Sequence, residues 1–336
     1  MNWTGGLALD KDLVLAAKPT NPDMRESVSI WLFEENGAFA FPRLGIEAEA
    51  PSWENRLYQA NFAFDGGRVL IGPGRGPAHI APGVLGAGPL KFRCIEPFHR
   101  WQATFDGDAI DGTVAQQIAK KLDPLKRTRL SFDVELTMVT PAWVQDNSPE
   151  KVASMSEAQK LEAGHMGIGH RIEHLFRAHG TLRIDGETKT FKAIGSRIHR
   201  RSVRPLAGFR GHCWQSAVFP DGRAFGYIAY PPNDDGSPSY NEGYVFQDGV
   251  MHKARAVKTP WLRRIVGAGD DVSLELESDL GITRIGGISA LNTFRVGNPD
   301  IGGLNLHQGG ARYTWGNQSA YGMIERSAHE SLTRIE

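Results

Sequence analysis

Residues 191–232 read FKAIGSRIHRRSVRPLAGFRGHCWQSAVFPDGRAFGYIAYPP and carry the clearest fold signal in the chain. Two runs rich in β-forming residues, 214–219 and 223–230, are joined by Pro220-Asp221-Gly222, a sequence typical of a tight turn between antiparallel strands. Short alternating runs that end at Asp-Gly or Gly-Asn turns recur before and after this hairpin. The repetition predicts an all-β fold built from antiparallel sheet.

Chain length and one change of pattern indicate two domains. A chain of 336 residues is too long for one ordinary core. Residues 148–164 form a helix-like run with a capping Ser, a Pro at the first helical position and a final Gly. We therefore predict two tandem β-barrel or sandwich domains, residues 1–147 and 169–336, joined by a short helical linker at residues 148–168.

Composition excludes several classes of protein. The 38 basic and 38 acidic residues balance and are interspersed, so there is no electrostatic footprint for nucleic acid or for an anionic membrane surface. The only two cysteines, Cys94 and Cys213, cannot form a metal-binding or disulfide framework. Neither an apolar membrane span nor a cleavable leader is recognisable. A reduced, cytoplasmic protein is expected.

The predicted hairpin places two chemically useful side chains together. His212 and Trp214 are two positions apart and therefore share one face of a strand, whereas Cys213 faces the other way. An imidazole beside an indole on the inner face of a sheet is a candidate general acid or base in an apolar pocket. The many arginines before this strand are more simply read as a solvated basic face.

Other runs supply candidates whose faces the sequence leaves partly open. The histidine-rich run 165–179 has irregular spacing and no HExxH motif, so the edge of a pocket is favoured over a metal site. Within it, Glu173 shares a face with Arg171 and Leu175. The remaining aromatic and imidazole candidates lie on alternating or consecutive strand positions whose inner face is undetermined: His99, Trp101, Tyr240 and Tyr244.

Four stretches together resemble a known family. They are residues 91–107 (KFRCIEPFHRWQATFDG), 171–186 (RIEHLFRAHGTLRIDG), 211–232 and 313–327 (YTWGNQSAYGMIERS). This combination is similar to the two-domain lipocalin-like superfamily of the carotenoid 1,2-hydratases, also called hydroxyneurosporene synthases, and most of all to a bacterial branch of it. The resemblance covers nearly the whole chain. It implies two stacked β-barrel-like domains with a ligand cavity near their junction and cofactor-free alkene hydration, terpenoid cyclisation or pericyclic ring formation.

One motif of the hydratases is present and a second is incomplete. Those enzymes use a His-x-Trp on one strand and a Tyr-x-Asp on the next to protonate an alkene. His212 and Trp214 match the first element, but the next strand, residues 226–230, reads GYIAY and has no carboxylate. A phenol with an ordinary pKa of about 10 is a poor acid for a bare alkene. Proton transfer beside a carbonyl or phenol, or expulsion of a leaving group, is therefore the expected chemistry.

These observations predict a cofactor-independent lyase, isomerase or hydratase that acts on a hydrophobic terpenoid, steroid or plant-type aromatic molecule. His212 is the expected general acid or base. Tyr227 or Tyr230 would orient an oxygen, Arg197 would stabilise negative charge, and Glu173 would be a second base or would orient His199. The expected substrate-binding residues are Trp214, His199, Tyr244, Trp101 and His99. Neither a metal nor an organic cofactor is expected, and a homodimer stays open. The alternative is a lipocalin-like carrier that binds the same ligand without turnover.

Overall fold

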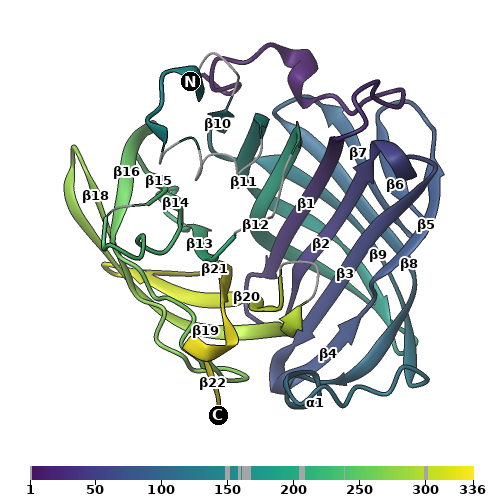
Figure 1. The fold of residues 1–336 in the computed structure, drawn as a ribbon. Helices are drawn as coiled ribbons and strands as arrows, with labels where there is room; N and C mark the ends of the chain where they lie inside the picture. Colours follow the sequence, from purple (N-terminus) through teal and green to yellow (C-terminus); the bar gives the residue numbers. More distant parts are fainter. Residues whose placement is uncertain are drawn as a thin grey trace.

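The chain folds as an all-β protein with two large antiparallel assemblies (Figure 1). The structure, a computed structural model, describes residues 2–147, 152–157, 160, 168–203, 209–237, 239–298 and 302–336. Within these residues, twelve strands form one sheet and eight strands close into a barrel. The predicted fold class is therefore confirmed. None of the described helices is long and apolar enough to cross a bilayer.

The first assembly is the twelve-stranded sheet. Its strands are β1 (Met24–Glu34), β2 (Phe39–Glu49), β3 (Asn55–Phe64), β4 (Arg68–Ile71), β5 (Gly74–His79), β6 (Val84–Ala87), β7 (Leu90–Glu96), β8 (Arg100–Thr113), β9 (Arg127–Met138), β10 (Trp143–Asn147), β11 (Ile168–Ile184) and β12 (Glu187–Val203). The main hydrogen-bonded order is β10-β11-β12-β1-β2-β3-β4-β8-β7-β6-β5, and β9 pairs with both β11 and β8.

The second assembly is the barrel. Its strands are β13 (Gly211–Val218), β14 (Ala224–Ala229), β15 (Asn241–Gln247), β16 (Val250–Lys258), β18 (Leu274–Ser278), β19 (Gly281–Asn298), β20 (Leu304–Trp315) and β21 (Gln318–Ala328). A small parallel pair joins β17 (Arg264–Ile265) to β22 (Arg334–Ile335). A short α-helix, α1, spans Val114–Ile118, and 3-10 turns span Leu9–Asp12, Ala50–Ser52, Asp65–Gly67 and Glu330–Leu332.

The predicted hairpin forms β13 and β14. The two strands pair antiparallel with Trp214 opposite Ile228. The turn closes through a hydrogen bond from the Gly222 amide to the Phe219 carbonyl at 3.0 Å. Gly222 has a φ of +89°, a conformation that glycine adopts without steric cost. The Pro-Asp-Gly signal thus fixes this part of the fold locally.

Strand pairing divides the chain at a different point from the predicted boundary. Most of the predicted linker, residues 148–168, lies outside the described residues. The long hairpin β11–β12 that follows it belongs to the first sheet, because the whole of β1 pairs with β12. This pairing runs from Met24 opposite Val203 to Glu34 opposite Ala193. Alternation in the sequence identifies these strands but does not say which sheet they join. The passage from sheet to barrel lies between β12 and β13.

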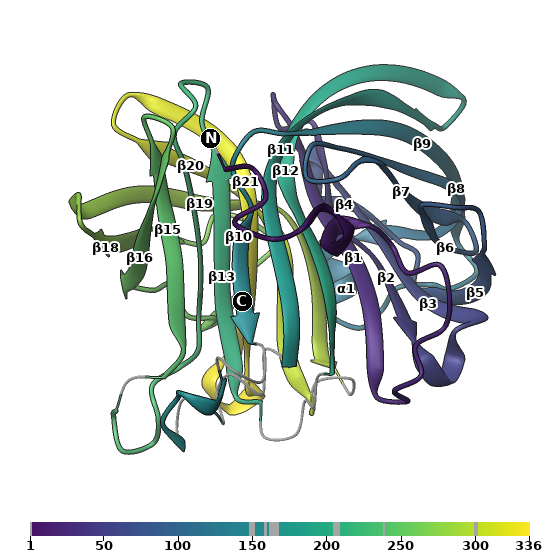
Figure 2. The same ribbon diagram turned by 90° about the horizontal axis from the view of Figure 1, so that it is seen from above.

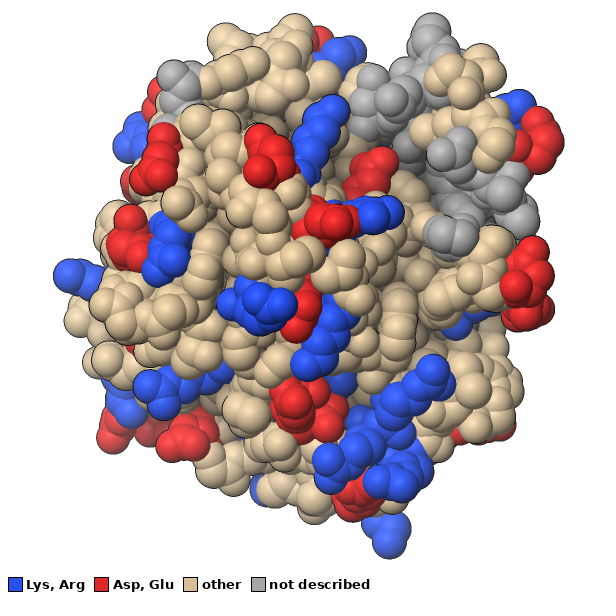
Figure 3. Space-filling view, turned by 90° about the vertical axis from the view of Figure 1, so that its left-hand side faces the viewer, with Lys and Arg blue, Asp and Glu red and all other residues tan. Residues whose placement is uncertain are grey.

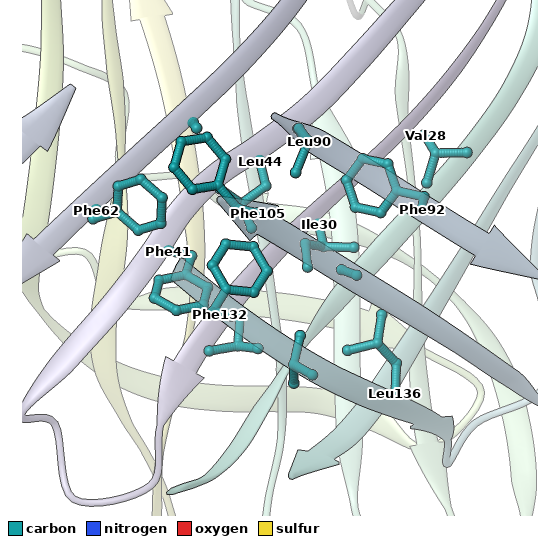
Figure 4. Close-up of a cluster of buried hydrophobic side chains, with 14 of the residues drawn as sticks. Val28, Ile30, Phe41, Leu44, Phe62, Leu90, Phe92, Phe105, Phe132 and Leu136 are labelled. Atoms are coloured by element: carbon teal, nitrogen blue, oxygen red, sulfur yellow. The ribbon is translucent and has the colours of Figure 1, made fainter. Parts of the chain in front are cut away.

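Apolar side chains form separate cores inside each assembly. Phenylalanines and leucines pack on the inner face of the first sheet, where the rings of Phe41 and Phe132 lie 4.8 Å apart between centroids (Figure 4). The barrel interior is filled by residues such as Leu274, Leu276 and Ile324. Interior-facing positions alternate with outward ones along each strand, so each strand also presents a second face.

A third core joins the two assemblies. It includes Trp31 of β1, Leu175 of β11 and Ile198 of β12, packed against Trp214 and Ile228 of the barrel. Figure 2 shows β13 and β21 of the barrel beside β11 and β12 of the sheet. Most of β1 is therefore buried on both faces, which explains why its sequence reads as a continuous β-forming run rather than as strict alternation.

Charged side chains on the barrel surface are mixed in sign. On the face shown in Figure 3, Lys and Arg are interspersed with Asp and Glu over most of the area. This face carries no extended field of one sign. The charge asymmetry that matters for a ligand lies inside the molecule, between the two assemblies.

Candidate functional site

A cavity of about 410 Å³ lies between the sheet and the barrel. Strands β1, β2, β3, β5, β11 and β12 line it on the sheet side, and β13, β14, β19, β20 and β21 line it on the barrel side. Its volume is in the range of pockets that enclose small organic ligands. Among the residues predicted for the site, those on its wall are His212, Trp214 and Tyr230.

His212 is held by two side chains of β21. The register of β13 with β21 sets His212 opposite Ser327 and Trp214 opposite Glu325. The Nδ1 atom of His212 lies 2.7 Å from the Ser327 hydroxyl, and Nε2 lies 3.1 Å from a carboxylate oxygen of Glu325. Gln308 donates to the other Glu325 oxygen at 2.7 Å. The imidazole is therefore fixed in orientation.

The Glu325 carboxylate is ionised over the whole physiological range. Burial raises its pKa, but the hydrogen bond and charge of His212, with Arg43 nearby, outweigh burial and lower the pKa of Glu325 to about 2. An ionised Glu325 accepts a hydrogen bond from His212 Nε2–H. The Ser327 hydroxyl can then donate to a neutral Nδ1 or accept from a protonated one. His212 can thus gain or lose a proton without losing a hydrogen-bond partner.

Trp214 lies in a stack of indoles and guanidinium groups. Its ring meets Trp31 edge to face at 4.7 Å between centroids, and the guanidinium of Arg171 lies 4.8 Å from its centroid. Its indole N–H donates to Glu173 at 3.3 Å. Arg171 also forms an ion pair with Glu173 at 2.9 Å. One face of Trp214 is therefore already occupied by a cation.

Glu173 supports this stack and does not contact His199. It is fully buried beside Arg171 and Trp214; burial raises its pKa, while the charge of Arg171 and these hydrogen bonds oppose that rise. The predicted face of β11, with Arg171 and Leu175 beside Glu173, is the one that packs toward the barrel. The proposed orientation of His199 by Glu173 is wrong, because His199 points to the opposite side of the sheet and bonds Asp12 and Glu26.

The two tyrosines of the hairpin point to opposite sides. Tyr230 lines the cavity and packs against Phe209 at 5.6 Å. Tyr227, an odd number of residues away, lies inside the barrel, where its hydroxyl contacts Cys213 at 3.3 Å and donates to Gln215. Burial raises the pKa of Tyr227 well above its ordinary value. Of the two tyrosines predicted for the site, Tyr230 therefore lies on the cavity wall and Tyr227 does not.

Arg197, His199 and Trp101 meet in a different buried cluster, inside the first sheet. Arg197 pairs with Asp12 at 2.8 Å, His199 Nδ1 lies 3.2 Å from the same oxygen, and the Trp101 indole donates to the second oxygen at 3.0 Å. The predicted placement of these residues at the cavity is wrong. On β12 the cavity-facing positions are Ile198 and Arg200, so the odd-numbered neighbours face inward.

Electrostatics favour the charged forms of Asp12 and His199 in this inner cluster. Burial raises the pKa of Asp12, but the charges of Arg197 and His199 outweigh it and leave the pKa far below the ordinary value. Burial lowers the pKa of His199, yet its hydrogen bonds to Asp12 and Glu26 produce a net rise. The cluster ties the N-terminal turn that holds Asp12 to the inner face of the sheet. Among the described residues, two of the buried Arg197 nitrogens, Nε and Nη1, have no hydrogen-bond partner in it.

His99 and Tyr244 also lie away from the cavity wall. His99 packs against Trp3 with ring centroids 5.2 Å apart. Tyr244 is buried against Trp143 at 5.4 Å, and burial raises its pKa well above the ordinary value. Their predicted role in binding substrate is not supported by this placement. Among the described residues, no group of three or more His, Cys, Asp or Glu side chains is arranged to hold a metal ion.

Comparison with known proteins identifies a family by sequence. Residues 12–330 match the profile of the family described as "Domain of unknown function (DUF7064)". The chain belongs to this family. A search of curated proteins finds no significant match by sequence.

Solved structures show the same fold at low sequence identity. A protein assigned as a candidate AttH of Nitrosomonas europaea is 14% identical, with a TM-score of 0.59 over 94% of this chain and 99% of that one. Kievitone hydratase of Nectria haematococca is 9% identical, with a TM-score of 0.51 over 97% and 95%. CghA in complex with Sch210972 is 10% identical, with a TM-score of 0.50 over 91% and 88%. These matches establish the lipocalin-like, two-assembly fold. The predicted link to carotenoid hydratases is not confirmed by them and stays a prediction.

Sequence reasoning missed the partners of His212 and the basic wall of the cavity. Glu325 and Ser327 are two positions apart in the run YGMIERS, so the sequence predicts that they share one face of a strand. The sequence does not predict that this strand pairs with the one that carries His212. Arg43 and Glu47 alternate with the inward-facing Leu44 and Ile46 of β2. That alternation indicates a polar face of β2 that points away from the core of the sheet. In the structure the barrel packs over this face.

Proposed function

We propose that the protein is a cofactor-independent acid/base enzyme of the lyase, isomerase or hydratase type, acting on a small molecule with a hydrophobic body in the cavity between sheet and barrel. The observation that carries this proposal is the pair His212 and Glu325 on the cavity wall, with Ser327 buried behind the imidazole. A buried imidazole with an ionised carboxylate on one nitrogen and a hydroxyl on the other can hold a proton or release one.

The Nε2 edge of His212 is the edge from which a proton would reach the substrate. Glu325, its partner there, lines the cavity, whereas Ser327 is buried behind Nδ1. A substrate atom that replaces the Glu325 oxygen would face the Nε2–H directly. Glu325, still held by Gln308, would balance the charge of the protonated ring. Tyr230 would orient an oxygen of the substrate from the same wall.

The fold neighbours support small-molecule chemistry in this architecture. One bears the name of a hydratase, and another was solved with Sch210972. At 9–10% identity they share the fold alone, so they carry no assignment of substrate or reaction. The proposal rests on this chain's own side chains.

A carrier without turnover is the second candidate, and one observation favours it. Both nitrogens of His212 already have protein partners, which is also the pattern of a structural histidine. A carrier needs an apolar wall and one or two polar anchors, and the cavity offers both. Activity and binding must therefore be measured side by side.

The test is a mass-spectrometric turnover screen of chelator-treated protein against terpenoid, steroid and plant-type aromatic compounds. The variants are His212→Ala and, as matched control, His252→Ala, which removes a histidine paired with Asp279 at 2.8 Å outside the cavity. We expect product from wild type and from the control, and a loss of about 100-fold or more in His212→Ala. Stoichiometric retention of unchanged compound by all three proteins would establish the carrier instead.

A further inference from the structure

The two walls of the cavity differ in character. The barrel wall presents apolar and aromatic side chains, among them Trp214, Ile228, Tyr230 and Leu306, and also the polar residues His212, Arg295, Asn298, Gln308 and Glu325. The sheet wall has an excess of basic residues: Arg25, Arg43, Arg75, Arg171 and Arg200 line it, against Glu47 and Glu49. A neutral hydrocarbon would satisfy only one of these walls. A ligand with an apolar body and an anionic group would satisfy both.

Arg25 and Arg43 are the least neutralised pair on the basic wall. They share one carboxylate, Glu47, at 3.7 Å and 3.5 Å, distances too long for good hydrogen bonds. Both side chains are only 16% exposed. Within the described residues, neither Nε atom nor the Glu47 Oε2 atom has a hydrogen-bond partner. Buried guanidinium donors without acceptors are costly, so a ligand that supplies acceptors would be stabilised there.

Glycine at position 45 lets Arg43 and Ser29 pack close to the backbone of β2. Gly45 lies between Arg43 and Glu47 on the outward face of β2. A Cβ atom at position 45 would come within 2.8 Å of the Ser29 hydroxyl and 3.1 Å of Arg43 Nε. Glycine thus allows the Ser29 hydroxyl and the Arg43 guanidinium, both on the cavity wall, to lie close together against the backbone of β2.

We infer that Arg25 and Arg43, with Ser29 above Gly45, form a subsite for a singly charged oxyanion, such as a carboxylate, on an otherwise apolar substrate. Two guanidinium groups pair directly with one carboxylate, Glu47, and the ionised Glu325 is the next carboxylate near Arg43, so at most one positive charge is left over. That excess matches a monoanion rather than a dianionic phosphate ester. That the bound anion is a substrate rests on the proposed function. That an anion binds at this subsite does not.

A pair of fluorescent probes tests it without knowledge of the natural ligand. 8-Anilinonaphthalene-1-sulfonate is an aromatic body with one negative charge, and N-phenyl-1-naphthylamine is the same body without it. We expect wild type to bind the anion at least about tenfold more tightly than the neutral probe, and Arg43→Gln or Arg25→Gln to remove about tenfold of that preference. Arg43→Lys, which keeps the charge, should retain part of it.

The control is Arg223→Gln. Arg223 also lies over an indole, Trp315 at 4.4 Å, and pairs with one carboxylate, Asp221 at 2.7 Å, but it is not on the cavity wall. The Arg223→Gln substitution should change neither the affinity for the anionic probe nor the affinity for the neutral probe. Unaltered binding of the neutral probe by the Arg43 variant verifies that the fold is intact. Three competitors can then displace the bound anionic probe: the monoanion 2-naphthoate, the dianion naphthyl phosphate and the neutral ester methyl 2-naphthoate. Stronger displacement by 2-naphthoate than by the other two would establish that the subsite prefers a monoanion.

Failure of this inference and failure of the proposed function are distinguishable. Equal affinity for the two probes, or an anion preference that survives both arginine substitutions, would overturn the subsite, whatever the turnover screen finds. An arginine-dependent preference in a protein that turns over no compound would support the subsite in a carrier. Stronger displacement by naphthyl phosphate than by 2-naphthoate would overturn the assignment to a monoanion.

Discussion

Replacing Glu325 by Gln should destabilise the fold in a manner that depends on pH. Gln keeps the size of the side chain and its contact with His212 but removes the charge. The folded protein lowers the pKa of Glu325 from 4.5 to about 2, so folding favours the ionised form. Since a tenfold change in proton affinity corresponds to about 1.4 kcal/mol, the charge contributes about 3 kcal/mol to the free energy of unfolding at pH 7.

The sign of the pH dependence follows from the direction of the shift. Because the folded pKa lies below the unfolded one, the contribution is fully present above about pH 5 and declines as the pH falls toward 2. By pH 3 the unfolded chain has bound its proton, and about 1 kcal/mol of the contribution remains. The stability difference between wild type and Glu325→Gln should therefore narrow by about 2 kcal/mol between pH 7 and pH 3.

Urea denaturation followed by circular dichroism at several pH values measures this difference. Glu277→Gln is the control, because Glu277 pairs with Arg255 at 2.6 Å on the exposed outside of the barrel. Glu277→Gln should change the free energy of unfolding by no more than about 1 kcal/mol at every pH, as is usual for exposed ion pairs. A gap between wild type and Glu325→Gln that stays constant from pH 7 to pH 3 would refute the coupling between Glu325 and His212.

Two further substitutions separate catalytic from structural groups. Asp12→Asn leaves the buried Arg197 without its counter-charge, so we expect a loss of about 3 kcal/mol or more in the free energy of unfolding, measured by urea denaturation, with probe affinity in the cavity unchanged. A loss of probe binding in a folded Asp12→Asn protein would show that the inner cluster belongs to the ligand site. Ser327→Ala removes the partner of His212 Nδ1, and we expect kcat to fall about tenfold with KM unchanged, measured with any substrate found in the turnover screen. A rise in KM with unchanged kcat would place Ser327 in binding rather than in proton transfer.

Local features of the chain were predictable because strand geometry has a fixed period. The Pro-Asp-Gly turn located the β13–β14 hairpin, and two-residue alternation put His212 beside Trp214 and Glu173 beside Arg171. Each of these statements concerns residues close in sequence. None of them required knowledge of which strands pair.

The rest of the site depends on long-range pairing, which alternation does not encode. Ser327 and Glu325 lie 115 and 113 residues beyond His212 and meet it because β21 pairs with β13. The inner face of β12 was equally undetermined, since the strand is buried on both sides and carries polar residues on both. Arg197 and His199 were therefore assigned to the cavity although they face the other way. A solvent-exposed face would have given the polarity contrast that this strand lacks.

The charge of the cavity bears on the kind of reaction it can support. Among the described residues, six arginines and three glutamates line it, and two of the arginines, Arg43 and Arg171, lie over the indoles of Trp31 and Trp214 at 4.8 Å each. Protonation of an isolated alkene creates a carbocation, which would meet like charge here and find the Trp214 face already occupied. An enolate or phenolate would instead be stabilised by the same guanidinium groups. In the proposed enzyme this charge would favour proton transfer beside a carbonyl or phenol over hydration of a bare double bond, and the guanidinium groups that would bind an anionic substrate would also stabilise the negative charge that develops during its reaction.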